Sequence, residues 1–287
     1  MCLIRAPTRD VANPNIRSGK TSISNVVFQK LPPAETLYLD STHKMETSTM
    51  NSFLTFEVTE IPSHVSVTGK EFDQNVLNNY GAAIWVLDVQ DEYFSAISGL
   101  IETAIFVFEN FPRLDFSVFI HKIDGLSDEY KTETFRDVRQ RVQDELSDAG
   151  YGDRGIFFYQ TSIFDHTIFE ASSKVIQKLL PQLPALEGML NRLCSACRIQ
   201  KCYLFDTMSK IYVATDASPT FLKDYEVCSD YVDIIADIKE IYGWKKRDGS
   251  HRGSPPAASQ NENEGGESVV TYDRSGDTYV YAKEVNE

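Results

Sequence analysis

Over residues 53–183, short apolar runs alternate with segments in which apolar residues recur at helical spacing. The apolar runs have the length of strands and cover 53–58, 82–87, 116–120 and 156–159. The helical patterns cover 93–108, 135–146 and 168–180, and the last one stops at Pro181. Strands that are apolar along their whole length are typical of a mostly parallel sheet with helices on both faces. The pattern therefore predicts an α/β domain with ligands at the carboxyl ends of the strands.

The rest of the chain follows a different pattern. A helix is expected over 186–193, a strand pair over 201–205 and 210–215, a long helix over 221–242, and two last strands over 268–272 and 278–282. The segment 246–267 is rich in Gly, Ser, Pro and Asn, which predicts disorder. The expected organisation is a first domain at 1–183, the first part of an α+β domain at 184–245, a linker at 246–267 and further strands at 268–287.

Composition narrows the possible partners. The 287 residues include 42 acids and 28 bases, for a net charge of −14. Such a balance disfavours nucleic acids and anionic membranes, which need basic patches, but it allows a nucleotide with a metal. No apolar run is long enough for a membrane span, so no direct membrane insertion is expected. The five cysteines favour reduced thiols in the cytoplasm.

The first candidate site is the stretch Ser18-Gly19-Lys20-Thr21-Ser22, which resembles the second half of a P-loop. Glycine allows close approach of phosphate to the backbone, Lys20 would reach the β and γ phosphates, and the Thr21 hydroxyl would ligate Mg²⁺. The first glycine position of the motif is occupied by Pro14, which has no N–H. No apolar run lies upstream, so the strand that normally precedes a P-loop is not expected.

The second candidate site follows the strand at 116–120. Asp124 would accept hydrogen bonds from the ring N–H and the exocyclic amine of guanine, for which adenine has no matching donors. Lys122 would lay its methylene stem along the base, and His121 would tie this loop to the phosphate loop. After the next strand, the backbone N–H groups around Ser162 and Ile163 would reach the guanine oxygen.

Together these residues make the chain similar to the Rag/Gtr family of small GTPases. The similarity is carried by 26–28, 35–42, 80–93, 119–128 and 160–166. His121 stands where many GTPases have asparagine, which points to the RagC/RagD-like branch, the fungal Gtr partner subunit.

The resemblance implies a P-loop GTPase domain followed by a roadblock (longin-like) domain, of which the last strands and helix would follow Glu287. It implies GTP or GDP with Mg²⁺, and Thr42 as the threonine that senses the γ-phosphate and the metal. It also implies a heterodimer with a RagA/B-type GTPase. The pair would be cytoplasmic and peripheral on the vacuole or lysosome through a scaffold complex, where it would report amino-acid supply to the TOR kinase complex.

One region departs from the family. Glu60-Ile61-Pro62-Ser63-His64 stands where the family has an acid followed by Pro-Gly-Gln. His64 replaces the glutamine near the attacking water, so any GTP hydrolysis is expected to be slow. Two alternatives to a GTPase switch therefore stay open. One is a catalytically inactive heterodimer subunit with weak or no nucleotide binding, and the other is a P-loop ATPase.

Overall fold

The computed structural model describes residues 2–5, 18–40, 42, 45–51, 55–62, 65–69, 73–91, 93–206, 209–242, 267–271 and 279–285. The chain forms two compact units, Met1–Leu222 and Lys223–Glu287. The domain boundary expected at residue 183 stays a prediction. Pro14, Ser63, His64 and, except for Glu267, the linker 246–267 lie outside the described residues.

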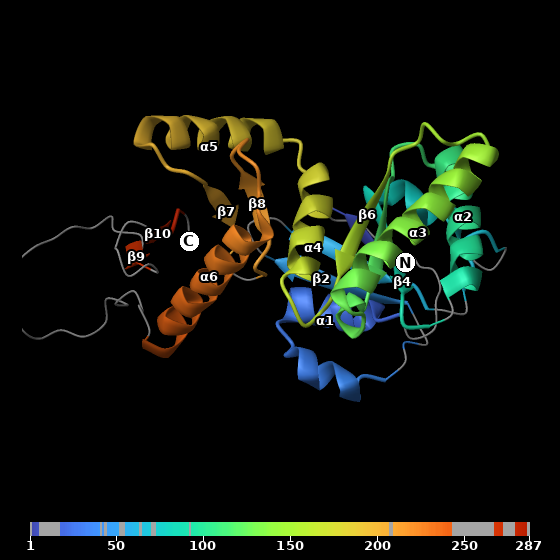
Figure 1. Cartoon of the computed structure of the whole chain (residues 1–287), viewed down its shortest axis with the longest axis horizontal. Coiled ribbons are helices and arrows are strands. Elements are labelled where there is room, and N and C mark those ends of the chain that lie inside the picture. Colours follow the sequence, from blue (N-terminus) through green and yellow to red (C-terminus); the bar gives the residue numbers. More distant parts are fainter. Residues whose placement is uncertain are drawn as a thin grey trace, which may run out of the picture. The chain divides into compact units, whose positions relative to one another are not determined.

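A six-stranded sheet with the order β2-β3-β1-β4-β5-β6 forms the centre of the first unit (Figure 1). Its strands are β1 (Cys2–Arg5), β2 (Glu46–Asn51), β3 (Thr55–Glu60), β4 (Ala82–Asp88), β5 (Asp115–His121) and β6 (Ile156–Thr161). Strands β3, β4, β5 and β6 run in one direction, and β1 and β2 run in the other. The mostly parallel sheet that the sequence predicts is confirmed.

The helices of the first unit are α1 (Lys20–Gln29), α2 (Tyr93–Asn110), α3 (Asp128–Asp148), α4 (Thr167–Lys178) and α5 (Leu183–Cys197), with the 3₁₀ helices η1 (Pro33–Tyr38), η2 (Gln74–Asn79) and η3 (Ile123–Gly125). Helices α1 to α4 cover the sheet, whereas α5 packs against β8 (Tyr212–Thr215), a strand outside this sheet (Figure 1). Helices α2 and α3 pack on one face, where their buried residues share a hydrophobic core with the alternate side chains Trp85, Phe116 and Val118. Helices α1 and α4 pack on the other face.

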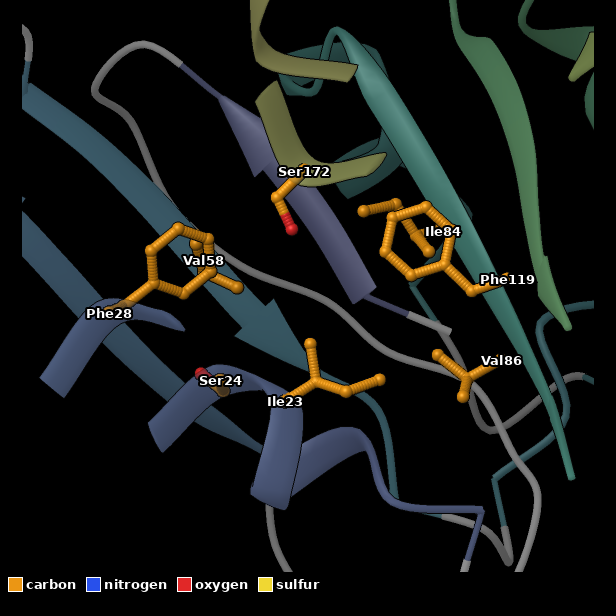
Figure 2. Close-up of a pocket in the computed structure, with 8 residues that line it drawn as sticks. All are labelled: Ile23, Ser24, Phe28, Val58, Ile84, Val86, Phe119 and Ser172. Carbon is orange, nitrogen blue, oxygen red and sulfur yellow. The ribbon is translucent and has the colours of Figure 1, made fainter. Parts of the chain in front are cut away.

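Strands β4 and β5 are buried almost from end to end, as their apolar sequences require. On the α1 face, Ile23 and Phe28 meet Ile84, Val86 and Phe119, as Figure 2 shows. These side chains line a small apolar cavity of about 10 Å³. This volume is about that of one water-sized probe, so the cavity is a packing gap in the core and not a ligand site.

Strand β1 corrects the expectation that no strand precedes the phosphate loop. It pairs with β3 and β4 and is antiparallel to both. This strand could not be predicted from the sequence, because four residues are too few to show a hydrophobic period. A strand that leads directly into a P-loop would run parallel to β3 and β4, whereas β1 runs antiparallel to both. Arg5, the last residue of β1, pairs with Glu57, which lies three residues before Glu60 at the carboxyl end of β3. Residues 6–17, which connect β1 to Ser18, lie outside the described parts.

Two short antiparallel strand pairs follow the main sheet in the sequence. Strands β7 (Tyr203–Phe205) and β8 (Tyr212–Thr215) pair within the first unit. The second unit contains α6 (Leu222–Tyr242) and the pair β9 (Glu267–Thr271) and β10 (Tyr279–Lys283). The predicted α+β character of this part is confirmed and is consistent with a roadblock-like domain. None of the helices in the described part of the chain is long and apolar enough to cross a bilayer.

The packing of β5 gives a stability prediction. Phe116 is 1% exposed in the sheet core, whereas the Phe221 ring is 64% exposed. We expect Phe116→Ala to lower the free energy of unfolding by about 3–5 kcal/mol, because it removes buried surface and leaves a cavity. Phe221→Ala, the same chemical change at an exposed position, should cost less than about 1 kcal/mol. Urea unfolding of both variants is the measurement, and equal losses would contradict the described core.

Candidate nucleotide-binding site

The phosphate loop is formed by Ser18 and Gly19 and by the first turn of α1. Gly19 is the N-cap residue, with φ 88° and ψ 13°, a left-handed conformation that favours glycine. The first hydrogen bond of α1 runs from Ile23 N–H to the Gly19 carbonyl at 2.8 Å. The N–H groups of residues 20–22 therefore point out of the helix end. The first turn of α1, all of which is described, has no acidic residue, so this end is suited to an anion.

Lys20, the first residue of α1, brings a positive charge to this end. It is only 8% exposed, and its Nζ donates a hydrogen bond to Ser18 Oγ at 3.2 Å. Ser18 is itself buried. Ser22 lies in the same helical turn and is half-buried. The residues predicted to bind phosphate therefore lie together at one helix terminus.

Three oxygen-bearing side chains meet next to this turn. Thr21 Oγ1 lies 2.7 Å from Glu60 Oε2 and 2.7 Å from Thr42 Oγ1. A carboxylate only accepts, so the single Thr21 proton goes to Glu60 and the Thr42 hydroxyl donates to Thr21. Glu60, at the end of β3, is 4% exposed. Two hydroxyls and one carboxylate, next to the phosphate loop, form a hard oxygen donor set that fits Mg²⁺ bound together with phosphate oxygens and water.

The base loop begins in register with its neighbouring strands. Asp88 at the end of β4 pairs with His121 at the end of β5, and His121 pairs with Thr161 at the end of β6. Lys122 follows in a left-handed conformation, with φ 62°, and its ammonium forms an ion pair with the Asp88 carboxylate. Gln90 Nε2 donates to the Lys122 carbonyl at 3.1 Å. The carboxyl ends of β4 and β6 thus hold the backbone and side chains of this loop in place.

Asp124 lies in η3 and is exposed, as a residue that reads a base edge must be. Its Oδ1 accepts a hydrogen bond from Ser162 Oγ at 2.6 Å, which fixes the carboxylate against the loop after β6. The Ser162 N–H is already used, because it donates to Thr167 Oγ1 at 2.9 Å. Ile163 is the next residue of this loop and is half-buried. Its N–H is therefore better placed than that of Ser162 for the predicted contact with the guanine oxygen.

His121 joins the two loops. Its ring is 1% exposed, and its Nδ1 lies 3.0 Å from Thr161 Oγ1. A Cβ added to Gly19 would lie 2.9 Å from His121 Cδ2, and 3.9 Å from Lys122 Cε. The backbone of the phosphate loop therefore lies directly against the first residues of the base loop. Burial and, to a smaller extent, the nearby Lys122 charge lower the pKa of His121 to about 4, so the ring is neutral at physiological pH.

The structure thus brings the predicted phosphate residues together at one end, and His121, Lys122, Asp124 and Ser162 at the other. His64, the predicted catalytic residue, lies outside the described residues. Sequence reasoning missed Glu60 as part of the site, and it missed Asp88 as the partner of Lys122. Both are acids at the carboxyl ends of sheet strands, and this position was the available signal.

Gly19 and Gly150 provide a matched pair of substitutions. Both have left-handed backbones, with φ +88° and +87°, but a Cβ at Gly150 would meet nothing within 4 Å. Gly150→Ala should lower the free energy of unfolding by about 1–2 kcal/mol, because of backbone strain alone. Gly19→Ala should cost about 1–3 kcal/mol more, because the buried His121 ring cannot move aside. Chemical denaturation of the two variants measures the difference, and equal destabilisation would rule out the described contact between the loops.

The low pKa of His121 predicts a pH-dependent stability. The pKa is about 4 in the folded state and about 6.5 in an unfolded chain. Between these values the unfolded state binds more protons, so stability falls as the pH drops from 6.5 towards 4, by up to about 1.4 kcal/mol per pH unit. His121→Asn should remove the histidine's contribution to the pH dependence of stability and leave the contribution of the carboxylates unchanged. Unfolding free energies of both proteins between pH 7 and pH 4.5 test this, and parallel pH profiles would contradict it.

Comparison with known proteins agrees with this geometry. The family description "Gtr1/RagA G protein conserved region" matches residues 15–232. The chain is 52% identical over 228 residues to GTP-binding protein gtr2 of Schizosaccharomyces pombe, covering 79% of this chain and 73% of that protein. It is 47% identical over 237 residues to Ras-related GTP-binding protein C of Homo sapiens, covering 82% of this chain and 59% of that protein.

A more distant similarity, 25% over 214 residues, links the chain to GTP-binding protein gtr1 of S. pombe. The family match covers more than half of the chain, and the high identities fall on Gtr2, RagC and RagD proteins. The chain therefore belongs to the Gtr1/RagA G-protein family, on its Gtr2/RagC/RagD-like branch.

Proposed function

We propose that this chain binds GTP and GDP as a subunit of a Rag/Gtr GTPase heterodimer. The observation that carries the proposal is the contact of the phosphate loop with the base loop at Gly19 and His121. A nucleotide that spans both loops would place its phosphates at the α1 terminus and its base beside Asp124. Relatives on the same branch are named GTP-binding proteins, which supports the same assignment.

At the phosphate end, the N–H groups of α1 and the Lys20 ammonium would bind the phosphate oxygens. Thr21 and Glu60, with Thr42 when the γ-phosphate is present, would hold Mg²⁺. When bound, the metal neutralises phosphate charge and orients the phosphates for transfer. Glu60 and Thr42 already contact the Thr21 hydroxyl, so the oxygens that would surround the ion are gathered at one point.

At the base end, Asp124 supplies the preference for guanine. Its carboxylate has acceptor capacity beyond the bond from Ser162, and guanine offers two adjacent donors, the ring N–H and the exocyclic amine. Adenine offers no donors in that arrangement and would leave the carboxylate unpaired, which is costly. Lys122 is held by Asp88 and would place its stem along the base face.

The proposed reaction is the attack of water on the γ-phosphate, promoted mainly by positioning and by charge neutralisation. Histidine occupies position 64, where the family has glutamine, so we propose slow intrinsic turnover. In the heterodimer the chain would pair with a RagA/B-type GTPase, in line with its similarity to gtr1. The pair would act at the vacuole or lysosome surface, bound to a scaffold complex, and would report amino-acid availability to the TOR kinase complex.

A second candidate is a heterodimer subunit that does not bind nucleotide. Two observations favour it. Pro14 stands at the first glycine position of the P-loop motif, and β1 runs opposite to a strand that would lead directly into that loop.

Fluorescent GDP titration with and without Mg²⁺ separates the two functions. We expect Mg²⁺-sensitive binding that excess ATP does not compete away. Asp124→Ala should weaken binding by a factor on the order of 100 or more, because the base loses its paired acceptor. Asp128→Ala is the matched control. The Asp128 side chain lies four residues after Asp124 and is 97% exposed, so this variant should bind GDP as the parent protein does. Absence of GDP binding in a folded protein would favour the inactive subunit, and competition by ATP would favour an ATPase.

A further inference from the structure

Three cysteines lie close together where α5 joins β7, away from the nucleotide site. Cys194 and Cys197 are in the last turns of α5, and Cys202 immediately precedes β7. Helix α5 ends at Arg198, whose φ of 57° reverses the chain direction. Ile199 N–H then donates to the Cys194 carbonyl at 3.1 Å. This tight helix end brings the chain back past Cys194 before β7 begins.

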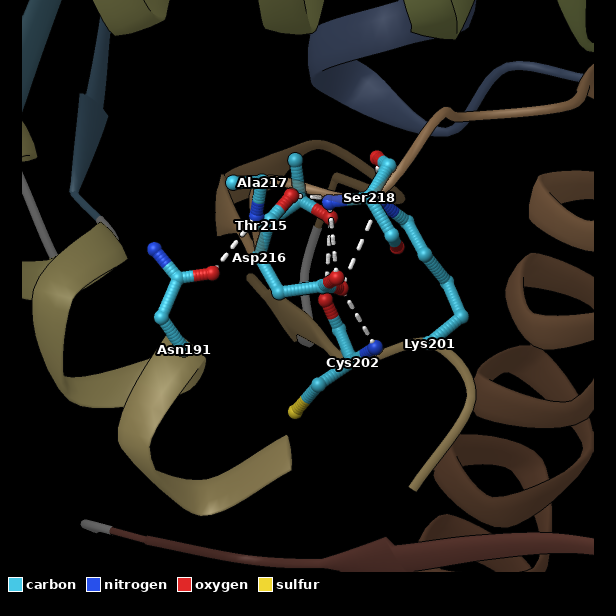
Figure 3. Close-up of polar contacts among 7 residues, drawn as sticks. All are labelled: Asn191, Lys201, Cys202, Thr215, Asp216, Ala217 and Ser218. Atoms are coloured by element: carbon cyan, nitrogen blue, oxygen red, sulfur yellow. Dashed lines mark hydrogen bonds and ion pairs between the residues drawn. The ribbon is translucent and has the colours of Figure 1, made fainter. Parts of the chain in front are cut away.

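The backbone of Cys202 is fixed on both sides (Figure 3). Its N–H donates to Asp216 Oδ1 at 2.8 Å, and its carbonyl accepts the Thr215 hydroxyl at 2.9 Å. Lys201 and Asp216 form an ion pair at 3.3 Å with side chains that are 11% and 4% exposed. Burial raises the pKa of Asp216, but hydrogen bonds from Ser218 and from the Cys202 N–H lower it below its usual value. The carboxylate is therefore ionised and holds Cys202 at neutral pH.

The thiol of Cys202 is directed at α5, the helix that carries Cys194 (Figure 3). In Figure 3 the Cys202 sulfur points away from the Asp216 carboxylate, towards the helix that carries Asn191, which is α5. Burial raises the pKa of the Cys194 thiol, and a side-chain hydrogen bond with Cys202 acts in the opposite direction, so the two side chains lie within reach of each other. Both residues are half-buried, whereas Cys197 is exposed. The Cys194 and Cys202 side chains thus lie near each other and are partly exposed, so a small oxidant can reach both thiols.

We propose that Cys194 and Cys202 form a reversible disulfide when the protein is exposed to a peroxide. Hydrogen peroxide takes two electrons from the pair: the two S–H bonds and the O–O bond break, one S–S bond forms, and the two thiol protons leave in two molecules of water. A thiol reductant reverses the reaction. The bond would close a ring from Cys194 to Cys202 and would fasten the last turn of α5 to the start of β7. It does not depend on nucleotide binding.

Two other arrangements of these thiols are disfavoured. Cys194 and Cys197 are three residues apart in α5, where Cβ atoms are about 5–6 Å apart. A disulfide needs about 3.5–4.5 Å between Cβ atoms, so this pairing would unwind the helix. A metal site is also disfavoured, because no cluster of three or more His, Cys, Asp or Glu side chains suited to a metal ion occurs in the described part of the chain.

The test is peptide mapping of the full chain after treatment with hydrogen peroxide, with free thiols blocked and no reductant. We expect one cross-linked species that contains Cys194 and Cys202, has lost the mass of two hydrogen atoms and disappears with dithiothreitol. Burial raises the pKa of Cys194, so the cross-link should form faster as the pH rises.

Two serine variants sharpen the result. Cys197→Ser, at the exposed neighbour, should leave the cross-link intact, and Cys202→Ser should abolish it. The wild-type map alone decides the question even if Cys202→Ser does not fold. A map in which both thiols stay free, in which Cys197 is the linked partner, or in which only disulfides between two chains form would overturn the proposal.

Discussion

The backbone of Gly19 lies against the buried ring of His121, and the rest of the candidate site depends on this contact. It leaves no room for a side chain at position 19, since a Cβ there would lie 2.9 Å from the ring. The imidazole in this contact is neutral at physiological pH, because burial and, to a smaller extent, the Lys122 charge lower the pKa of His121 to about 4. Because the two loops touch, the phosphate end and the base end belong to one continuous site.

The sheet determines which side chains meet there. In parallel strands the carboxyl ends lie at one edge, and the register places Asp88, His121 and Thr161 side by side. Asp88 holds the Lys122 ammonium, His121 contacts Gly19, and Thr161 bonds the imidazole. Glu60 ends β3, which runs in the same direction, and reaches the Thr21 hydroxyl from there. The Lys122 ammonium is therefore balanced by the Asp88 carboxylate at the same edge of the sheet.

Apolar periodicity predicted β4, β5, β6 and their helices well, because buried strands and amphipathic helices must be apolar at fixed spacings. Short motifs predicted Lys20, Thr21 and Asp124 as ligand contacts. The structure places Lys20 and Thr21 in the first turn of α1 and Asp124 in η3 after β5, and their roles in ligand binding stay predictions. Periodicity did not predict β1, which has four residues and takes its place through pairing with β3 and β4. The Thr21–Glu60 bond and the contact of Cys194 with Cys202 were also missed. Both contacts form between segments that the fold brings together, either from distant parts of the chain or across a reversal of chain direction. Local sequence patterns do not encode such contacts.

The most direct test of the central claim is an experimental structure with GDP and Mg²⁺ bound. We expect the β-phosphate at the N-terminus of α1 beside Lys20, the metal at the Thr21 hydroxyl, and the guanine edge on the Asp124 carboxylate, with the Gly19 backbone still against His121. Nucleotide bound elsewhere, or Lys20 and Asp124 too far apart for one GDP molecule to reach both, would contradict this claim.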